Sequence, residues 1–67
     1  MPRKVRELVK DLQDAGFQLL PGAGKGPHRK FVHPSYSGAV TLSGRPGDDA
    51  KHYQERQVSK AIEEVQG

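Results

Sequence analysis

Two stretches at opposite ends of the chain carry the same apolar pattern, and this pair most limits the folds open to the sequence. In each stretch, apolar residues recur at i, i+3, i+4 and i+7, the spacing of one helical face. They are Val5, Leu8, Val9 and Leu12 in the first stretch and Val58, Ala61, Ile62 and Val65 in the second. The spacing predicts a helix over residues 3–15, ended by Gly16, and a second helix from about His52 or Tyr53 to Gln66. Each stripe must be buried against another element.

The middle of the chain predicts that other element to be a sheet. Three short runs suited to strands, separated by glycine- and proline-rich turns, cover residues 17–20, 29–33 and 39–43. In the last run Val40 and Leu42 alternate with small or polar residues, as in a strand with one buried face. The sequence therefore predicts an α+β, two-layer domain of order α-β-β-β-α over residues 1–67. Its three-stranded antiparallel sheet is covered on one face by both helices, similar to the double-stranded-RNA-binding fold.

Size and composition exclude several kinds of site. The 67-residue chain has no cysteine, which excludes disulfides and thiolate zinc sites. It contains no apolar run of membrane-spanning length and no signal-peptide pattern, so we expect a cytoplasmic protein without membrane contact. A domain of this size buries only roughly 60% of its unfolded surface, so we expect marginal stability that a bound partner would increase.

The charges are unevenly distributed along the chain. The net charge is +3, and no acidic residue occurs between Asp14 and Asp48. That span contains the cations Lys25, Arg29, Lys30 and Arg45. A cationic zone favours a polyanionic partner such as RNA, although solvated loop charges remain the alternative interpretation.

His28 is the candidate for chemistry within this zone. An odd number of positions separates His28 from Phe31, so their side chains point to opposite faces of a strand. If Phe31 packs under the helices, His28 and Lys30 project from the open face and Arg29 lies at the edge of the core side. An imidazole titrates at about pH 6.5, and beside a cation it suits phosphodiester cleavage. An ordinary strand-end histidine is the alternative.

The other polar candidates have structural explanations. We expect His33 to pack at a strand end and His52 to be solvated, and no histidine pair has the i, i+4 spacing of a helical metal site. Residues 22–26 fail the phosphate-loop pattern, because Gly26 follows Lys25 where serine or threonine is needed. Asp48 and Asp49 are expected to cap the second helix. No metal is therefore expected.

Several pieces of the chain, in register over nearly its full length, resemble the HicA toxins of bacterial and archaeal toxin–antitoxin systems. The pieces are Val5-Arg6-Glu7-Leu8-Val9-Lys10 leading to Ala15-Gly16-Phe17, then Gly26-x-His28-x-x-Phe31 with His33-Pro34, and finally Gly47-Asp48-Asp49-Ala50-Lys51 with Tyr53-Gln54. The resemblance implies a ribonuclease that cleaves messenger RNA. It also implies a HicB-type antitoxin that masks the active face.

The resemblance maps the functional histidine of the family onto His28. With it we expect RNA contacts from Lys25, Gly26, Arg29, Lys30 and Arg45, cleavage without metal or cofactor, and no assigned second acid or base. We also expect a protein that is monomeric alone and hetero-oligomeric with its antitoxin. One residue departs from the family pattern: Pro27 stands where serine is usual, which removes a hydroxyl and fixes φ.

Two functions from other classes remain open at this point. The first is a non-catalytic RNA-binding module on the same fold. Such modules usually carry a lysine cluster at the start of the last helix, whereas residues 48–52 are half acidic here. The second is a purely protein-binding domain, which leaves the acid-free span unexplained.

Overall fold

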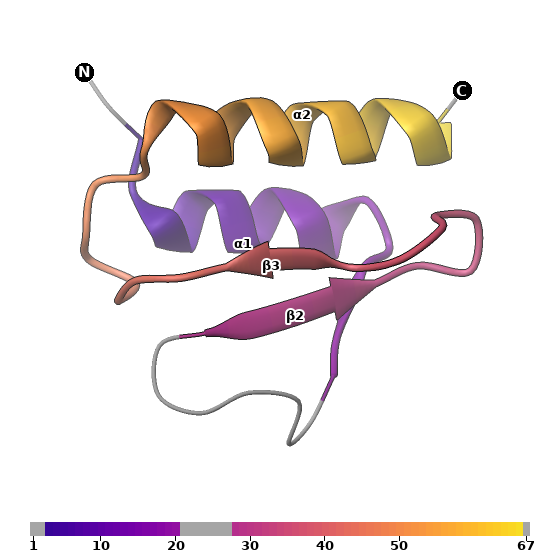
Figure 1. The fold of residues 1–67 in the computed structure, drawn as a ribbon, viewed down its shortest axis with the longest axis horizontal. Coiled ribbons are helices and arrows are strands. Elements are labelled where there is room, and N and C mark those ends of the chain that lie inside the picture. The colour runs from indigo at the N-terminus through magenta and orange to yellow at the C-terminus, as the bar shows by residue number, and fades with distance from the viewer. Residues whose placement is uncertain (1–2, 21–27, 67) are drawn as a thin grey trace.

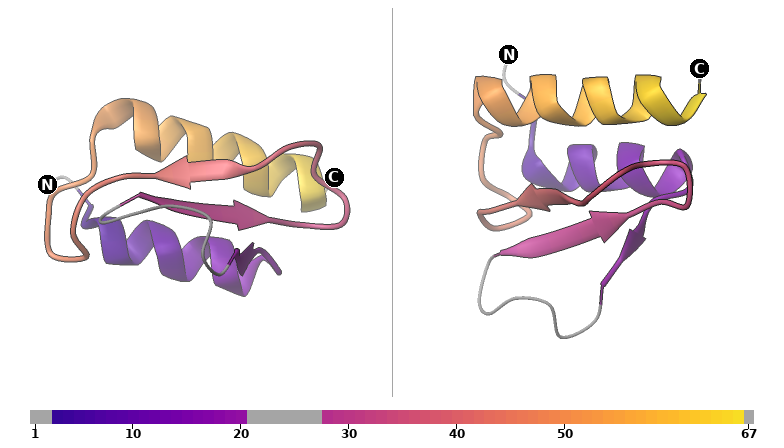
Figure 2. Two further views of the ribbon diagram at one scale, coloured as in Figure 1. Left: turned by 60° about the horizontal axis from the view of Figure 1, so that its bottom comes forward. Right: turned by 45° about the vertical axis from the view of Figure 1, so that its right-hand side comes forward.

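The computed structural model describes residues 3–20 and 28–66. Its elements are α1 (Val5–Asp14), β1 (Gln18–Leu19), β2 (Arg29–Val32), β3 (Val40–Leu42) and α2 (His52–Gln66). The strands form one antiparallel sheet in the order β1-β2-β3. The α1 helix lies behind the sheet, and α2 runs alongside α1 and next to β3 (Figures 1 and 2). This arrangement confirms the predicted element order and the α+β class.

The core lies between the helices and the inward side of the sheet. Phe31 in the central strand β2 is 0% exposed, and in β3 Val40 and Leu42 are buried while Thr41 is exposed, as the alternation predicted. The buried apolar residues come from both helices, two strands and the connections: Val5, Leu8, Leu12, Phe17, Phe31, Val40, Leu42, Ala50, Val58 and Ala61. The opposite face of the sheet, which is turned toward the viewer in Figure 1, is covered by no described helix. The fold thus leaves one face of β2 and β3 open.

Gly16 ends α1 as the sequence predicted. Its φ of 98° is left-handed, a conformation that glycine adopts without the steric cost of a Cβ. The Phe17 N–H donates to the Leu12 carbonyl at 2.9 Å, and the Gly16 N–H donates to the Gln13 carbonyl at 3.0 Å. This pair of bonds is a Schellman motif. It turns the chain sharply, so Phe17 enters the core directly and β1 begins one residue later.

The expectation that Asp48 and Asp49 cap α2 is wrong. The Asp48 carbonyl accepts the Val5 N–H at 2.9 Å, and Asp49 pairs with Lys4 through both a β-bridge and an ion pair. Both acids therefore contact the start of α1 and stabilise it, because the loop after β3 folds back onto that helix. At the start of α2, the Lys51 N–H instead donates to the Gln54 side chain at 2.9 Å, which is half of a capping box.

No helix within residues 3–20 and 28–66 is long and apolar enough to cross a membrane.

Candidate nucleic-acid interface on the open sheet face

His28 immediately precedes β2, and the strand register fixes the face on which it lies. Lys30 pairs with Thr41, and both are exposed, whereas Phe31 pairs with Val40, and both are buried. His28 is two residues before Lys30, so alternation places it on the open face, and its side chain is exposed. The predicted opposite orientation of Lys30 and Phe31 is therefore confirmed, and the position of His28 on the face of Lys30 stays a prediction from alternation.

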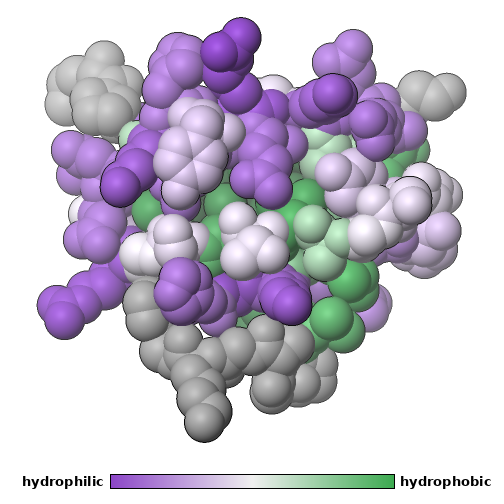
Figure 3. Space-filling view, in the orientation of Figure 1, coloured by the Kyte–Doolittle hydropathy of each residue, from purple (hydrophilic) through white to green (hydrophobic). Residues whose placement is uncertain are grey.

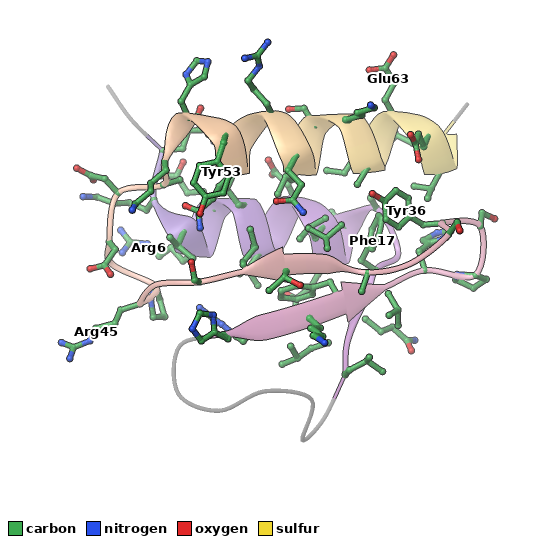
Figure 4. The ribbon with its side chains drawn as sticks, viewed as in Figure 1. Arg6, Phe17, Tyr36, Arg45, Tyr53 and Glu63 are labelled. Atoms are coloured by element: carbon green, nitrogen blue, oxygen red, sulfur yellow. The ribbon has the colours of Figure 1, made fainter. Side chains whose placement is uncertain are left out.

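Arg29 joins the start of β2 to the loop after β3. Its side chain is half-buried on the inward side, and its guanidinium donates to the Gly44 carbonyl at 3.4 Å. Arg45 comes next in that loop and is exposed, and its N–H donates to the Asp48 carboxylate at 2.9 Å. Figure 4 shows the Arg45 side chain extending away from the body at the end of the molecule where β2 begins. The structure thus brings Arg29 and Arg45 to the end of the sheet that carries His28.

The other expectations for this region concern residues 21–27. Lys25 and Gly26 as RNA contacts, Pro27 as the departure from the family pattern, and the glycine-rich loop all lie outside the described residues. The described part of the candidate interface therefore consists of His28, Arg29, Lys30 and Arg45.

Arg6 is a further cation at the same end, outside the set of residues that the sequence predicted to contact RNA. The structure pairs its neighbour Arg3 with Asp11 and Glu7, and the hydrogen bond to Asp11 raises the pKa of Arg3. Arg6 instead lies next to the loop after β3. Its guanidinium nitrogen is 3.9 Å from the position that a Cβ of Gly47 would occupy. Figure 4 shows Arg6 and Arg45 at one end of the molecule. The sequence held a signal for this, since Arg6 is followed four residues later by Lys10 rather than by an acid.

His33 packs at the end of β2, as expected, and Tyr36 packs beside it against the core. The His33 ring packs on Phe17 with centroids 5.1 Å apart, and its Nδ1 accepts the Ser35 N–H at 2.9 Å. Tyr36 meets Phe17 edge to face at 5.5 Å. His52 is exposed at the start of α2, which agrees with its expected solvation. Across residues 3–20 and 28–66, no three His, Asp or Glu side chains gather as metal ligands would.

Gln54 is a buried polar residue that sequence reasoning missed. It is 3% exposed, and its Nε2 donates to the Ser43 carbonyl at 3.0 Å and lies 3.5 Å from the Ser43 Oγ. Its Oε1 accepts the Lys51 N–H at 2.9 Å. One amide side chain therefore ties the start of α2 to the end of β3, next to the start of β2.

We expect Gln54→Ala to lower the free energy of unfolding by about 2 kcal/mol, because it leaves the Ser43 carbonyl and the Lys51 N–H without their partner. Denaturant unfolding of the purified variant measures this loss. Gln13→Ala, at an exposed position of α1, is the control and should stay within about 0.5 kcal/mol of wild type. Equal stability of the two variants would show that the Gln54 bonds contribute nothing.

The surface around the candidate interface is mostly polar, with apolar side chains gathered at one corner. Figure 3 shows hydrophilic and neutral residues across the open face and a hydrophobic group toward the β1 side. Leu19 and Leu20, at 45% and 39% exposed, lie in and beside the edge strand β1. The open face thus combines cations and a histidine with a small apolar border.

Comparison with known protein families gives a match. A family model described as "HicA toxin of bacterial toxin-antitoxin" matches residues 5–63 of the 67-residue chain. The matched range begins at the first residue of α1, includes the whole sheet and ends three residues before the end of α2. No curated protein and no solved structure matches the chain.

Proposed function

The chain belongs to the HicA family of toxins from bacterial toxin–antitoxin systems, and on that premise we propose that it is a ribonuclease that cleaves messenger RNA. The observation that carries the proposal is the placement of His28. Its exposed imidazole lies just before the start of β2, where Arg29 and Arg45 also lie, and strand alternation directs it toward the open face of the sheet. An RNA strand has access to this face, because no described helix covers it (Figure 1).

The proposed reaction uses the RNA's own hydroxyl as nucleophile. His28 takes the proton from a ribose 2′-OH, the 2′ oxygen attacks the adjacent phosphorus, and the bond to the 5′ oxygen of the next nucleotide breaks. That oxygen leaves with a proton, so the products end in a 2′,3′-cyclic phosphate and a 5′-OH. The donor of this last proton is not assigned. The mechanism uses no metal and no cofactor.

In the proposed mechanism the cations act electrostatically on the phosphates of the RNA. Lys30 projects from the same face as His28 and is exposed, so it can contact the phosphate beside the reacting ribose. Arg29 and Arg45 extend the positive surface past the end of the sheet. The proposed RNA-binding residues also include Lys25 and Gly26, which belong to residues 21–27.

We expect RNA affinity to depend on salt through these cations. For a single strand, each phosphate contact contributes about 0.7 to the slope of log K against log salt concentration, so Lys30→Gln and Arg45→Gln should each lower the slope by about that amount. Fluorescence anisotropy over a salt series measures it. Lys10→Gln is the control, because Lys10 is ion-paired with Asp14 on α1, behind the sheet. A slope that neither open-face substitution changes would remove these residues from the interface.

The proposed partner follows from the family. A HicB-type antitoxin would bind over the open face and exclude RNA, forming a hetero-oligomer with a toxin that is a monomer on its own. We take residues 1–67 as a single domain that acts in the cytoplasm, where its substrate is translated.

An RNA degradation assay on the purified protein tests the proposed function. In EDTA, the wild type should cut messenger RNA and leave 2′,3′-cyclic phosphate ends. RNA binding without any cleavage would favour the alternative, a non-catalytic RNA-binding module on the same fold. Cleavage that EDTA abolishes would contradict the metal-free mechanism.

A further inference from the structure

Tyr53 is an aromatic side chain that the core does not use. It is 59% exposed near the start of α2, whereas Phe17 and Phe31 are buried and Tyr36 packs on Phe17. In the part of the chain that the structure describes, both aromatic contacts involve Phe17, so no other aromatic ring packs on Tyr53. Tyrosine is enriched at binding surfaces, because it combines an apolar ring with a polar tip.

The Tyr53 ring lies on the same side of the molecule as the open sheet face. Figure 4 shows it on the near side of α2, extending toward β3. The near side of the sheet in this view is the face that no described helix covers, and α2 runs next to β3 (Figure 1). One RNA strand can therefore contact both the open face and the ring.

The residue after Tyr53 fixes the position of the ring relative to the cations. Gln54 is 3% exposed, and its Nε2 donates to the Ser43 carbonyl at 3.0 Å. Ser43 begins the loop that carries Arg45, and the next carbonyl of that loop accepts the Arg29 guanidinium at 3.4 Å. The first turn of α2 is thus tied to the segment that carries the candidate RNA-binding cations.

Cations and an exposed aromatic ring on one side of a molecule suit single-stranded nucleic acid. The cations contact the phosphates, and the bases stack on the ring. A base of a single strand can turn toward the ring, whereas the bases of a duplex are stacked on one another inside it. An acidic peptide would match the cations as well, but it lacks the flat bases that stack on an aromatic ring.

We infer that Tyr53 stacks on an unpaired base of the RNA and thereby makes single-stranded segments the substrate. The inference rests on the proposed ribonuclease function and extends its contacts from the phosphates to the bases. Every base presents a π face, so the contact holds the strand on the open face without selecting a sequence.

The first test is the affinity for a fluorescently labelled 2′-O-methyl oligoadenylate, which attack by a 2′-OH cannot cut. Fluorescence anisotropy should show binding about 5- to 150-fold weaker for Tyr53→Ala, the effect of one lost stacking contact, and close to wild type for Tyr53→Phe, which keeps the ring. The slope of log K against log salt concentration should not change, because no cation is removed. Ser59→Ala, at an exposed position of the same helix, is the control and should bind as wild type does.

The second test reads the Tyr53 ring directly. The chain has two tyrosines and no tryptophan, so in Tyr36→Phe the tyrosine emission comes from Tyr53 alone. Phenylalanine keeps the ring that packs on Phe17, so this variant should fold. The single-stranded oligoadenylate should quench the emission, because a stacked base quenches a phenol, whereas an abasic strand of the same length should not.

Equal affinity of wild type and Tyr53→Ala for the single strand overturns the inference, whatever the rate of cleavage, and so does loss of antitoxin binding as the only effect. Emission that the oligoadenylate and the abasic strand change equally also overturns it. With the duplex of oligoadenylate and oligouridylate, wild type and Tyr53→Ala should bind equally. Weaker single-strand binding by Tyr53→Ala, in a protein whose wild type cuts no RNA, would support the stacking contact and refute the ribonuclease function instead.

Discussion

Phe31→Ala is expected to leave much of the protein unfolded. Phe31 is fully buried in the central strand, where it pairs with Leu19 on one side and Val40 on the other. Replacing a buried phenylalanine with alanine costs about 3–5 kcal/mol. Stability scales at roughly 0.05–0.15 kcal/mol per residue, so a 67-residue chain has about 3–10 kcal/mol in total. The loss of one ring therefore removes a large part of the free energy of folding.

Circular dichroism during urea denaturation measures this loss, with two comparison variants. Tyr53→Ala removes an aromatic ring that is 59% exposed on α2 (Figure 4), and its stability should stay within about 0.5 kcal/mol of wild type. Phe31→Leu keeps most of the apolar volume and should lie between the two. A Phe31→Ala protein as stable as Tyr53→Ala would contradict the central place of Phe31 in the core.

The parts of the fold that the sequence predicted correctly depend on local patterns. The i, i+3, i+4, i+7 stripe of α1 and the glycine that ends it require only neighbouring residues, and so does the alternation of Val40 and Leu42. The opposite orientation of Lys30 and Phe31 belongs to the same class, because one strand determines it. For that reason the open-face position of the candidate histidine could be predicted before the structure.

The parts that sequence reasoning missed depend on contacts between distant segments. Asp48 and Asp49 lie next to α2 in sequence but brace α1 in space, since the loop after β3 folds back onto that helix. Ser43 and Gln54 meet only when α2 docks beside β3. The predicted strand over 17–20 shortens to Gln18–Leu19, and at its start the Phe17 N–H is bonded to the Leu12 carbonyl of α1 instead of to a neighbouring strand.

His28→Ala is the substitution with the largest expected effect on activity. General acid–base catalysis by one positioned side chain contributes about 100- to 10,000-fold to a rate, and the cleavage rate should fall by that factor. His28 is exposed, so its removal leaves the core intact, and the stability should change by no more than about 0.5 kcal/mol. RNA affinity should change little, because Arg29, Lys30 and Arg45 remain.

His52→Ala is the matched control for that loss. His52 is also an exposed histidine, but it stands at the start of α2, and the proposed chemistry gives it no part. An effect of general histidine loss, such as weaker non-specific binding of RNA, would appear in both variants. An effect on catalysis at the site beside the start of β2 should appear in His28→Ala alone.

The most direct measurement is therefore the single-turnover rate of cleavage of one messenger RNA in EDTA by wild type, His28→Ala and His52→Ala. A catalytic His28 predicts that wild type and His52→Ala cut at the same rate, while His28→Ala binds the RNA equally well and cuts it at least about 100-fold more slowly. Cleavage by His28→Ala at the wild-type rate would contradict the assignment of His28 as the catalytic residue.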